Sequence, residues 1–430
     1  MKKVLSIISA LVFLCGCGGN REEILKVYNW SDYIDETVLG DFEQWYFEQT
    51  GETIHVIYQT FDVNETMLSK IEKGKEDYDV ICPSDYILER MLNDGLLLPL
   101  DFASLPDSIN YIENNRSPYI RDMFAKFNPE IDANDYSVAY MWGTTGILYN
   151  TRYVTEEEAS TWDVIRNPKF ADKIFIKDAP RDVFSPILIY LRQKELKEGT
   201  VTIEDLMHDS SDESLAEVEA YLKEVKELVA GWEADFGKDQ MTRERGWISL
   251  NWSGDAVWAI EEAANVGVEL KYVVPKEGSN VWFDGWVIPK YAANVKAATY
   301  FIDFMCRPDI AIRNMEETGY VSANGDISVL ESQIDEELDP IDVSYFFPGA
   351  DSVRVDPALY PDRSTIELCA LEHDWGKDTS KLIAMWSRVK GENASVSTVV
   401  VIAIVLAAAL AFALYKRFGT RRKGGKKRRK

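Results

Sequence analysis

Histidine and cysteine are scarce in this 430-residue chain, and their positions exclude several kinds of site. None of the three histidines lies near another in a metal-binding pattern, so we predict neither a zinc site nor a histidine-based catalytic triad: they are His55, His208 and His373. Cys82, Cys306 and Cys369 also lack metal-ligand spacing. The first two lie in apolar runs, which predicts buried thiols, at most one disulfide, and no metal or cofactor.

Positive charge is sparse over most of the chain. Of the 47 basic residues, ten lie in residues 416–430 and two are Lys2 and Lys3, which leaves 35 against 72 acidic residues. A body this acidic repels nucleic acid, so we exclude DNA and RNA as partners. The same charge attracts cationic ligands, although many of these acids serve solubility alone.

The first 17 residues have the pattern of an export signal. Two lysines precede the apolar run Val4–Leu14, which is too short to span a membrane as a mature helix. The run ends in Leu14-Cys15-Gly16-Cys17, which resembles the bacterial lipobox, where the cysteine is lipidated and becomes residue one. We therefore expect residues 1–17 to form a lipoprotein signal peptide with a lipid on Cys17. An ordinary signal peptide with a chance cysteine is the alternative.

The C-terminal region has a second membrane signal. Residues 396–415 carry no charge and are long enough to cross a hydrocarbon core of roughly 30 Å. The basic tail, residues 416–430, should stay in the cytoplasm. The sequence thus predicts a transmembrane helix with the acidic body outside the cytoplasm, anchored through Cys17, through this helix, or through both. A sorting signal that is later cleaved, or an extension acquired apart from binding, are the alternatives.

Between Ile24 and about Pro289, strand and helix patterns alternate. Predicted strands cover residues 24–28, 53–58 and 78–82, and predicted helices cover 39–48, 64–73 and 87–93. This alternation predicts an α/β fold with a largely parallel sheet, in which ligand-binding residues gather at strand ends. Further helices are expected at 292–304, 309–317 and 381–389, with a surface connection at 327–337.

The first predicted strand ends in a cluster of aromatic and polar residues, Val27-Tyr28-Asn29-Trp30-Ser31-Asp32-Tyr33. A structural interpretation is a strand that runs into a capped helix, with Tyr28 and Trp30 in the core. The functional interpretation is a loop that binds a cation, because aromatic faces and a carboxylate both attract an ammonium group. The same combination recurs further along the chain, which favours the functional interpretation.

These recurring segments resemble the bacterial spermidine/putrescine-binding proteins, the receptors of polyamine ABC importers. The similar segments run in order from about Leu25 to about Lys390; they are Tyr28–Tyr33, Asn64–Thr66, Tyr78–Val80, Pro83–Tyr86, Tyr140–Gly146, Asp178–Phe184, Asn251–Asp255, Pro275–Gly278, Trp282–Asp284, Arg307–Asp309 and Thr318–Tyr320. The resemblance implies an α/β, two-lobed periplasmic binding protein fold with crossing hinge strands. Lobe 1 would comprise residues 24–141 and 284–328, and lobe 2 residues 142–283 and 329–391.

The resemblance also implies a polyamine between the lobes. Buried ammonium groups need anions, and rings suit the methylene chain between them. We expect three carboxylates (Asp182, Asp255 and Asp284), six rings (Trp30, Tyr33, Tyr86, Trp252, Trp282 and Tyr320) and three polar contacts (Ser31, Asp32 and Ser84). Glu372 lies near the family's last polar contact, where the local match is poor.

Each carboxylate has a structural alternative. Asp182 and Asp255 could cap the helices that begin beside them, and Asp284 before Gly285 suits a turn. Some of the motifs resemble spermidine-preferring members of the family, and others resemble putrescine-preferring members. Trp282 would add apolar surface for a longer ligand, which favours spermidine slightly over putrescine. If so, Trp282→Ala should weaken the binding of spermidine more than the binding of putrescine.

The predicted function is therefore that of an extracytoplasmic binding protein that captures polyamine and delivers it to ABC permease and ATPase subunits. We expect a monomer. A receptor for another cationic solute, or a membrane-tethered polyamine sensor, is the alternative. An enzyme, such as a glycosidase using Asp182 and Asp255, is disfavoured because the sequence has no nucleophile motif, metal set or phosphate loop.

Overall fold

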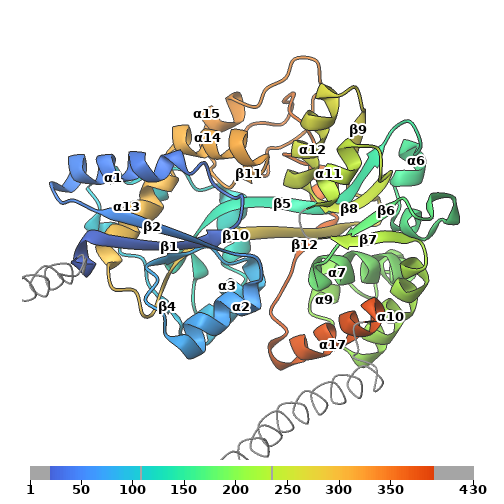
Figure 1. Cartoon of the computed structure of the whole chain (residues 1–430), viewed down its shortest axis with the longest axis horizontal. Coiled ribbons are helices and arrows are strands. Elements are labelled where there is room, and N and C mark those ends of the chain that lie inside the picture. Colours follow the sequence, from blue (N-terminus) through green and yellow to red (C-terminus); the bar gives the residue numbers. More distant parts are fainter. Residues whose placement is uncertain (1–19, 107–108, 234–235, 392–430) are drawn as a thin grey trace, which may run out of the picture.

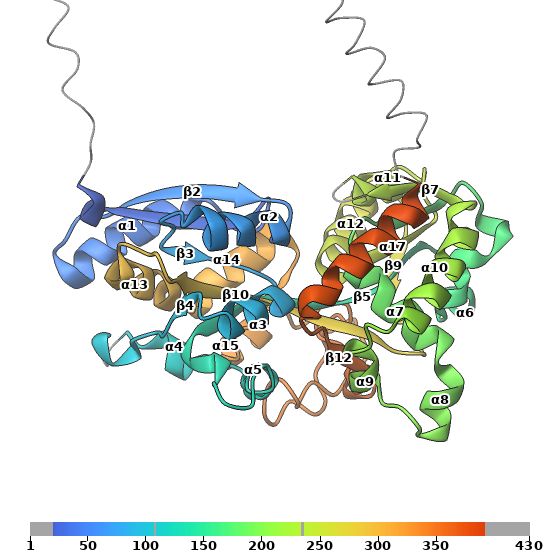
Figure 2. The ribbon, with the colours of Figure 1, turned by 90° about the horizontal axis from the view of Figure 1, so that it is seen from below.

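Two long strands, β5 (Ser137–Asn150) and β10 (Ser279–Pro289), pair antiparallel through the middle of the molecule. The structure is a computed structural model that describes residues 20–106, 109–233 and 236–391. Figures 1 and 2 show the two strands linking two bulky halves, each a group of helices around one end of a sheet. Every residue of β10 is buried, as expected for a strand that is covered on both faces.

A mixed sheet runs through both halves (Figure 1). Its other strands are β1 (Ile24–Trp30), β2 (His55–Phe61), β3 (Val80–Ile81), β4 (Leu97–Leu98), β6 (Ile174–Lys177), β7 (Val229–Glu233), β8 (Ile248–Trp252), β9 (Leu270–Val273), β11 (Val321–Ser322) and β12 (Cys369–Leu371). The order is β2-β1-β3-β10-β5-β8-β6-β7, with β4 and β12 on β10 and with β9 and β11 on β5. β1 is parallel to β2 and β3, and β6 is parallel to β7 and β8. The parallel pairs thus lie at the two ends of the sheet, and the antiparallel β5–β10 pair joins them.

Helices cover the sheet in both halves. The first half contains α1 (Thr37–Thr50), α2 (Asn64–Ser69), α3 (Asp85–Asn93), α4 (Tyr111–Asn114), α5 (Pro118–Phe124), α13 (Val295–Met305), α14 (Pro308–Thr318) and α15 (Ile327–Glu331). The second half contains α6 (Glu156–Ala159), α7 (Pro180–Leu191), α8 (Gln193–Glu198), α9 (Ile203–Met207), α10 (Asp212–Lys226), α11 (Gly237–Thr242), α12 (Ser253–Asn265) and α17 (Thr379–Lys390). A short helix, α16 (Arg363–Ile366), precedes β12.

Aromatic packing fixes the helices of the first half. Phe42 of α1 meets Phe301 and Phe304 of α13 edge-on, with ring centroids 5.1 and 5.6 Å apart. In the second half, α7, α10 and α17 share one apolar core. Residues 329–366, which we predicted in lobe 2, contribute Val343, Phe346 and other apolar side chains to a core cluster that also contains side chains of α2, α3 and α5. The exact lobe bounds remain a prediction.

The predicted elements agree with the structure in type and place. β1, β2 and β3 overlap the predicted strands, and α1, α3, α13, α14 and α17 overlap the predicted helices. The surface connection predicted for 327–337 is wrong in its first part, because α15 buries Val329 and Leu330. Cys82 is buried, Cys306 and Cys369 are partly buried, and all three are free thiols.

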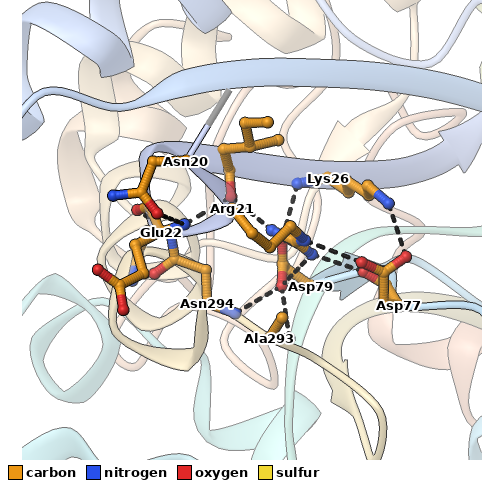
Figure 3. Close-up of polar contacts among 10 residues, drawn as sticks. Asn20, Arg21, Glu22, Lys26, Asp77, Asp79, Ala293 and Asn294 are labelled. Atoms are coloured by element: carbon orange, nitrogen blue, oxygen red, sulfur yellow. Dashed lines mark hydrogen bonds and ion pairs between the residues drawn. The ribbon is translucent and has the colours of Figure 1, made fainter. Parts of the chain in front are cut away.

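A buried carboxylate fixes the start of the first strand (Figure 3). Asp79 is fully buried and accepts hydrogen bonds from the backbone of Lys26, Ala293 and Asn294, as well as from the Arg21 guanidinium. These contacts come from three parts of the chain: Arg21, Lys26 and the adjacent Ala293 and Asn294. This one side chain therefore ties the beginning of the described chain to β1 and to the connection between β10 and α13.

Within the described residues, no helix is long and apolar enough to cross a membrane. The predicted signal peptide, the lipidation site Cys17 and the predicted span at 396–415 lie outside the described residues.

Candidate functional site

Three strand-to-helix junctions bring acidic residues toward the middle of the molecule. β3, β6 and β8 lead into α3, α7 and α12, whose first turns carry Asp85, Asp182 and Asp255. In α/β sheets such junctions collect ligand-binding groups, and the positive end of a helix dipole favours a carboxylate. The capping alternative for Asp182 and Asp255 is wrong, because Ala179 and Trp252 hold the N-cap positions.

Asp284 comes from β10, at an irregularity in its pairing with β5 between Asp284 and Gly285. Such a bulge re-aims a side chain. Here the carboxylate accepts hydrogen bonds from Ser84 Oγ at 2.6 Å and Tyr33 OH at 2.7 Å. Only 6% of Asp284 is exposed, and burial raises its pKa to about 6 against these two hydrogen bonds. Both donors are neutral hydroxyls, so they leave the charge of the carboxylate uncompensated.

Asp182 lies on the other half, at the start of α7. Burial raises its pKa to about 6, although hydrogen bonds from Asn280 and Trp252 and the charges of Arg181 and Lys177 oppose the shift. The distance from Asn280 Nδ2 to its Oδ1 is 3.1 Å. The negative charge of Asp182 also raises the pKa of Asp284, so the two carboxylates interact across the junction of the halves. A cation placed between them would relieve this repulsion.

Asp255 has the opposite environment. Its carboxylate meets Lys177 Nζ at 2.5 Å and Lys238 Nζ at 3.4 Å, and it accepts a 3.0 Å hydrogen bond from Tyr320 OH. Burial alone would raise the pKa of Asp255, but the charges of the two lysines outweigh it and the pKa is lowered. Asp255 therefore already has cationic partners within the chain.

Lys177 is the residue that sequence reasoning missed most plainly. Its side chain is fully buried at the end of β6, and its ammonium also lies 3.3 Å from Glu233 and 4.4 Å from the centre of the Trp252 ring. Burial opposes its charge, but Asp255 and Glu233 raise its pKa, so it stays protonated. A lysine that ends the apolar strand Ile174–Lys177 was the available signal.

Three of the six predicted rings are in direct contact. Tyr320 meets Tyr33 edge-on at 5.0 Å and Trp282 at 5.7 Å between centroids. A Cβ on Gly254 would lie 2.2 Å from the Tyr320 ring, so only glycine lets α12 approach that ring. Trp282 is 8% exposed and thus packs within the cluster rather than forming an open wall.

Tyr86 has a cation on its face. The Arg181 guanidinium lies 4.6 Å from the Tyr86 ring centre and 4.7 Å from that of Trp375. Arg181 donates to the carbonyl of His373 at 2.6 Å and lies 3.8 Å from Glu372. Burial and the nearby charge of Asp182 raise the pKa of Glu372 well above its ordinary value. This stack joins α3 of the first half to α7 of the second, and sequence reasoning did not single out Arg181.

Two predicted polar residues lie apart from the buried group. Ser31 and Asp32 are exposed, and Ser31 Oγ donates to Asp62 at 2.8 Å. Asp32 has a backbone φ of 50°, a left-handed conformation that aspartate adopts more readily than most residues. Trp30, by contrast, is half-buried, with its ring 4.5 Å from that of Phe61. The structure thus gathers Trp30, Tyr33, Ser84, Asp182, Trp252, Asp255, Trp282, Asp284 and Tyr320, and leaves Ser31 and Asp32 at the surface.

Two histidines that are distant in sequence are neighbours in space. The rings of His208 and His373 stack with centroids 3.9 Å apart. A carboxylate oxygen of Glu204 lies beside both rings, and the three side chains together could hold a metal ion. His373 also contacts Glu89 at 3.2 Å, and the two glutamates outweigh burial and raise its pKa to about 9. The tertiary fold makes this contact, which spacing could not reveal.

Comparison with known proteins agrees with this architecture. Residues 41–335 match the model of a family described as bacterial extracellular solute-binding protein. The chain is 29% identical to the putrescine-binding periplasmic protein PotF of Escherichia coli over 79% of this chain and 84% of that protein. It is 28% identical to the spermidine/putrescine-binding periplasmic protein of the same species, over 85% of this chain and 91% of that one.

A solved structure is similar along nearly its whole length. The spermidine/putrescine ABC transporter substrate-binding protein PotD from Streptococcus pneumoniae superposes with a TM-score of 0.64 at 31% identity, covering 86% of this chain and 98% of that one. The expected periplasmic binding protein fold is therefore confirmed. The chain belongs to the bacterial extracellular solute-binding protein family, a family of binding proteins rather than of enzymes.

Proposed function

We propose that this protein is an extracytoplasmic receptor that binds a polyamine between its two halves and delivers it to an ABC importer. The names of its relatives, which refer to putrescine and spermidine, support this ligand class. The family description supports a place outside the cytoplasm.

One observation carries the proposal: two buried carboxylates from opposite halves, Asp182 and Asp284, interact, and no cationic side chain among the described residues is bonded to Asp284. Both have a pKa raised to about 6, and the hydrogen-bond donors of Asp284 are neutral hydroxyls. Such a pair is unfavourable alone and becomes favourable when an ammonium group enters. The rings of Trp30 and Trp252 supply apolar surface suited to a methylene chain.

The test is calorimetric titration of the full chain, purified in mild detergent, with putrescine, spermidine and an uncharged amino acid. We expect one polyamine per chain. Asp284→Asn should weaken binding by about 2 to 4 kcal/mol, because a buried charge pair loses one partner.

The matched control is Asp41→Asn, which also removes one negative charge. Asp41 pairs with Arg313 at the surface and is 55% exposed at its side chain, so binding should not change. A folded wild-type protein that binds neither polyamine would overturn the proposed function.

The delivery step implies permease and ATPase partners and a body held near the membrane. We propose that Cys17 carries a lipid, that residues 396–415 form a membrane helix, and that the body acts as a monomer. The sequence alone supports these anchors, since both lie outside the described residues. Membrane fractionation of Cys17→Ala tests them: full release of the protein would argue against a retained helix.

A further inference from the structure

One carboxylate of the candidate site already holds an ammonium group, and that group belongs to the chain itself. Lys177 Nζ lies 2.5 Å from Asp255, 3.3 Å from Glu233 and 4.4 Å from the centre of the Trp252 ring. Carboxylates at hydrogen-bond distance and an aromatic face are the surroundings that a bound alkylammonium requires. The lysine side chain is itself a butylammonium, so chemically it matches one end of a polyamine.

The position is built rather than incidental. Lys177 is fully buried, and Glu233 and Asp255 are buried with it. Lys177 ends β6, Trp252 ends the neighbouring β8, and Asp255 lies one turn into α12. Tyr320 OH fixes the other oxygen of Asp255 at 3.0 Å. The ammonium is thus fixed by elements that also carry the predicted ligand-binding residues.

The charges in this region limit what else can bind. Asp255 and Glu233 are compensated by Lys177, with Lys238 adding a second contact to Asp255. Burial raises the pKa values of Asp85 and Glu372 well above their ordinary values, which favours the neutral form of each carboxyl group. Glu372 also lies beside the Arg181 guanidinium. Among the described residues, Asp182 and Asp284 are the buried carboxylates left for a ligand, although the charges of Arg181 and Lys177 also act on Asp182. Two carboxylates match two ammonium groups.

We propose that Lys177 acts as a built-in ammonium group that fills one cation position of the site and restricts the ligand to a diamine such as putrescine. This inference rests on the proposed polyamine function. It departs from the spermidine preference suggested by Trp282, because a triamine needs a third anionic position and Lys177 occupies that position.

The direct test is titration of the wild-type full chain and of Lys177→Ala with putrescine and spermidine. The wild type should prefer putrescine. The substitution should shift the ratio of the two affinities at least tenfold toward spermidine, because Asp255 becomes available to the third amine. A wild type that prefers spermidine, or an unchanged ratio in Lys177→Ala, would overturn the proposal.

Lys173→Ala is the matched control. Lys173 also lies over a tryptophan, 5.2 Å from the centre of the Trp247 ring, but within the described part of the chain its ammonium donates to the carbonyl of Arg245 and pairs with no carboxylate. Lys173→Ala removes the same charge from the segment that leads into β6, and it should leave the ratio of the putrescine and spermidine affinities unchanged. If Lys177→Ala fails to fold, Lys177→Ala with Glu233→Gln serves in its place, because Asp255 is then the one carboxylate that has lost Lys177, with Lys238 still 3.4 Å away.

A second measurement separates this inference from the proposed function. n-Propylammonium replaces the atoms that Lys177→Ala removes, so it should raise the melting temperature of that variant and not that of Lys173→Ala. n-Propanol, which lacks the charge, should have no such effect. If the wild type binds no polyamine, the proposed function fails, yet rescue by propylammonium still supports an ammonium position at Asp255. Absence of rescue would overturn that position.

Discussion

Asp284 and Asp255 are the same residue type, one in strand β10 and the other in the first turn of α12, and their electrostatic environments are opposite. Asp284 is hydrogen-bonded by two neutral hydroxyls and has a raised pKa of about 6. Asp255 meets two lysines, which lower its pKa despite its burial. Both are about equally buried, at 6% and 5% exposure.

The comparison teaches that burial alone does not identify a ligand carboxylate. What differs is whether the chain supplies the counter-charge. A carboxylate held by neutral donors keeps its charge available for a cation from outside, whereas one paired within the chain contributes to stability instead. We therefore propose that Asp284 binds the ligand and that Asp255 contributes first to the stability of the fold.

The largest expected effect is on the free energy of unfolding, which should respond differently to substitution of Asp255 and of Asp284. Asp255→Ala should lower the free energy of unfolding by about 3 to 5 kcal/mol, because buried Lys177 loses its nearest anion. Asp284→Ala should change it by less than about 1 kcal/mol, because losing a poorly solvated carboxylate offsets the loss of two hydrogen bonds. Urea unfolding at pH 7 measures both. Equal losses in the two variants would contradict the comparison.

The next effect concerns the packing that positions the Asp255 side. Gly254→Ala should cost about 1 to 3 kcal/mol of stability, because the new methyl group would collide with the Tyr320 ring. It should also displace the Tyr320 hydroxyl from Asp255. Gly40→Ala is the control: nothing lies within 4 Å of its added Cβ, and alanine suits α1, so stability should hold or rise slightly. Thermal unfolding of both variants gives the answer.

A third prediction uses pH to sharpen the contrast. The pKa values of Asp182 and Asp284 are raised to about 6, so both become protonated as pH falls through 6. A cationic ligand prefers the ionised forms. Polyamine affinity should therefore be full above pH 7 and fall by at least about tenfold at pH 5, with proton release on binding near pH 6. Titration in buffers of different ionisation enthalpy detects that release.

Ser84→Ala tests which carboxylate is responsible for this pH dependence. The hydrogen bond from Ser84 lowers the pKa of Asp284, so its loss should move the midpoint of the affinity curve to higher pH. Asp255 has a lowered pKa and should not contribute in this range. A midpoint unaffected by Ser84→Ala would assign the titration to another group.

The smallest effect concerns the contact between the halves at His373. Its pKa is raised from 6.5 to about 9 by Glu204 and Glu89, against burial. The stabilisation is therefore fully present below pH 6.5 and is lost as pH rises through 9. It should amount to about 1 kcal/mol, since the Glu204 side chain is half exposed. His373→Gln should remove this pH dependence from urea unfolding measured between pH 6 and 10.

Much of the site was predictable because it consists of local motifs. Ser84 and Tyr33 follow strands, and Asp284 lies in a Trp-Phe-Asp-Gly segment, and the resemblance of these segments to the spermidine/putrescine-binding proteins singled them out. Partners were not predictable. Lys177 and Asp255 are far apart in sequence, and no local pattern links a strand-end lysine to a helix in another segment. The same limit hid the stacked histidines and the Arg181–Tyr86 contact.

The sequence by itself determined the alternation of strands and helices, the acidic character of the body and the residue types available for a cation. These depend on side-chain periodicity, backbone preferences and charge, which are properties of short segments. The tertiary structure decided which carboxylate receives an internal cation, and where residues 329–366 pack. Electrostatic pairing acts between atoms a few ångströms apart, so it is fixed only when the fold has placed distant segments together.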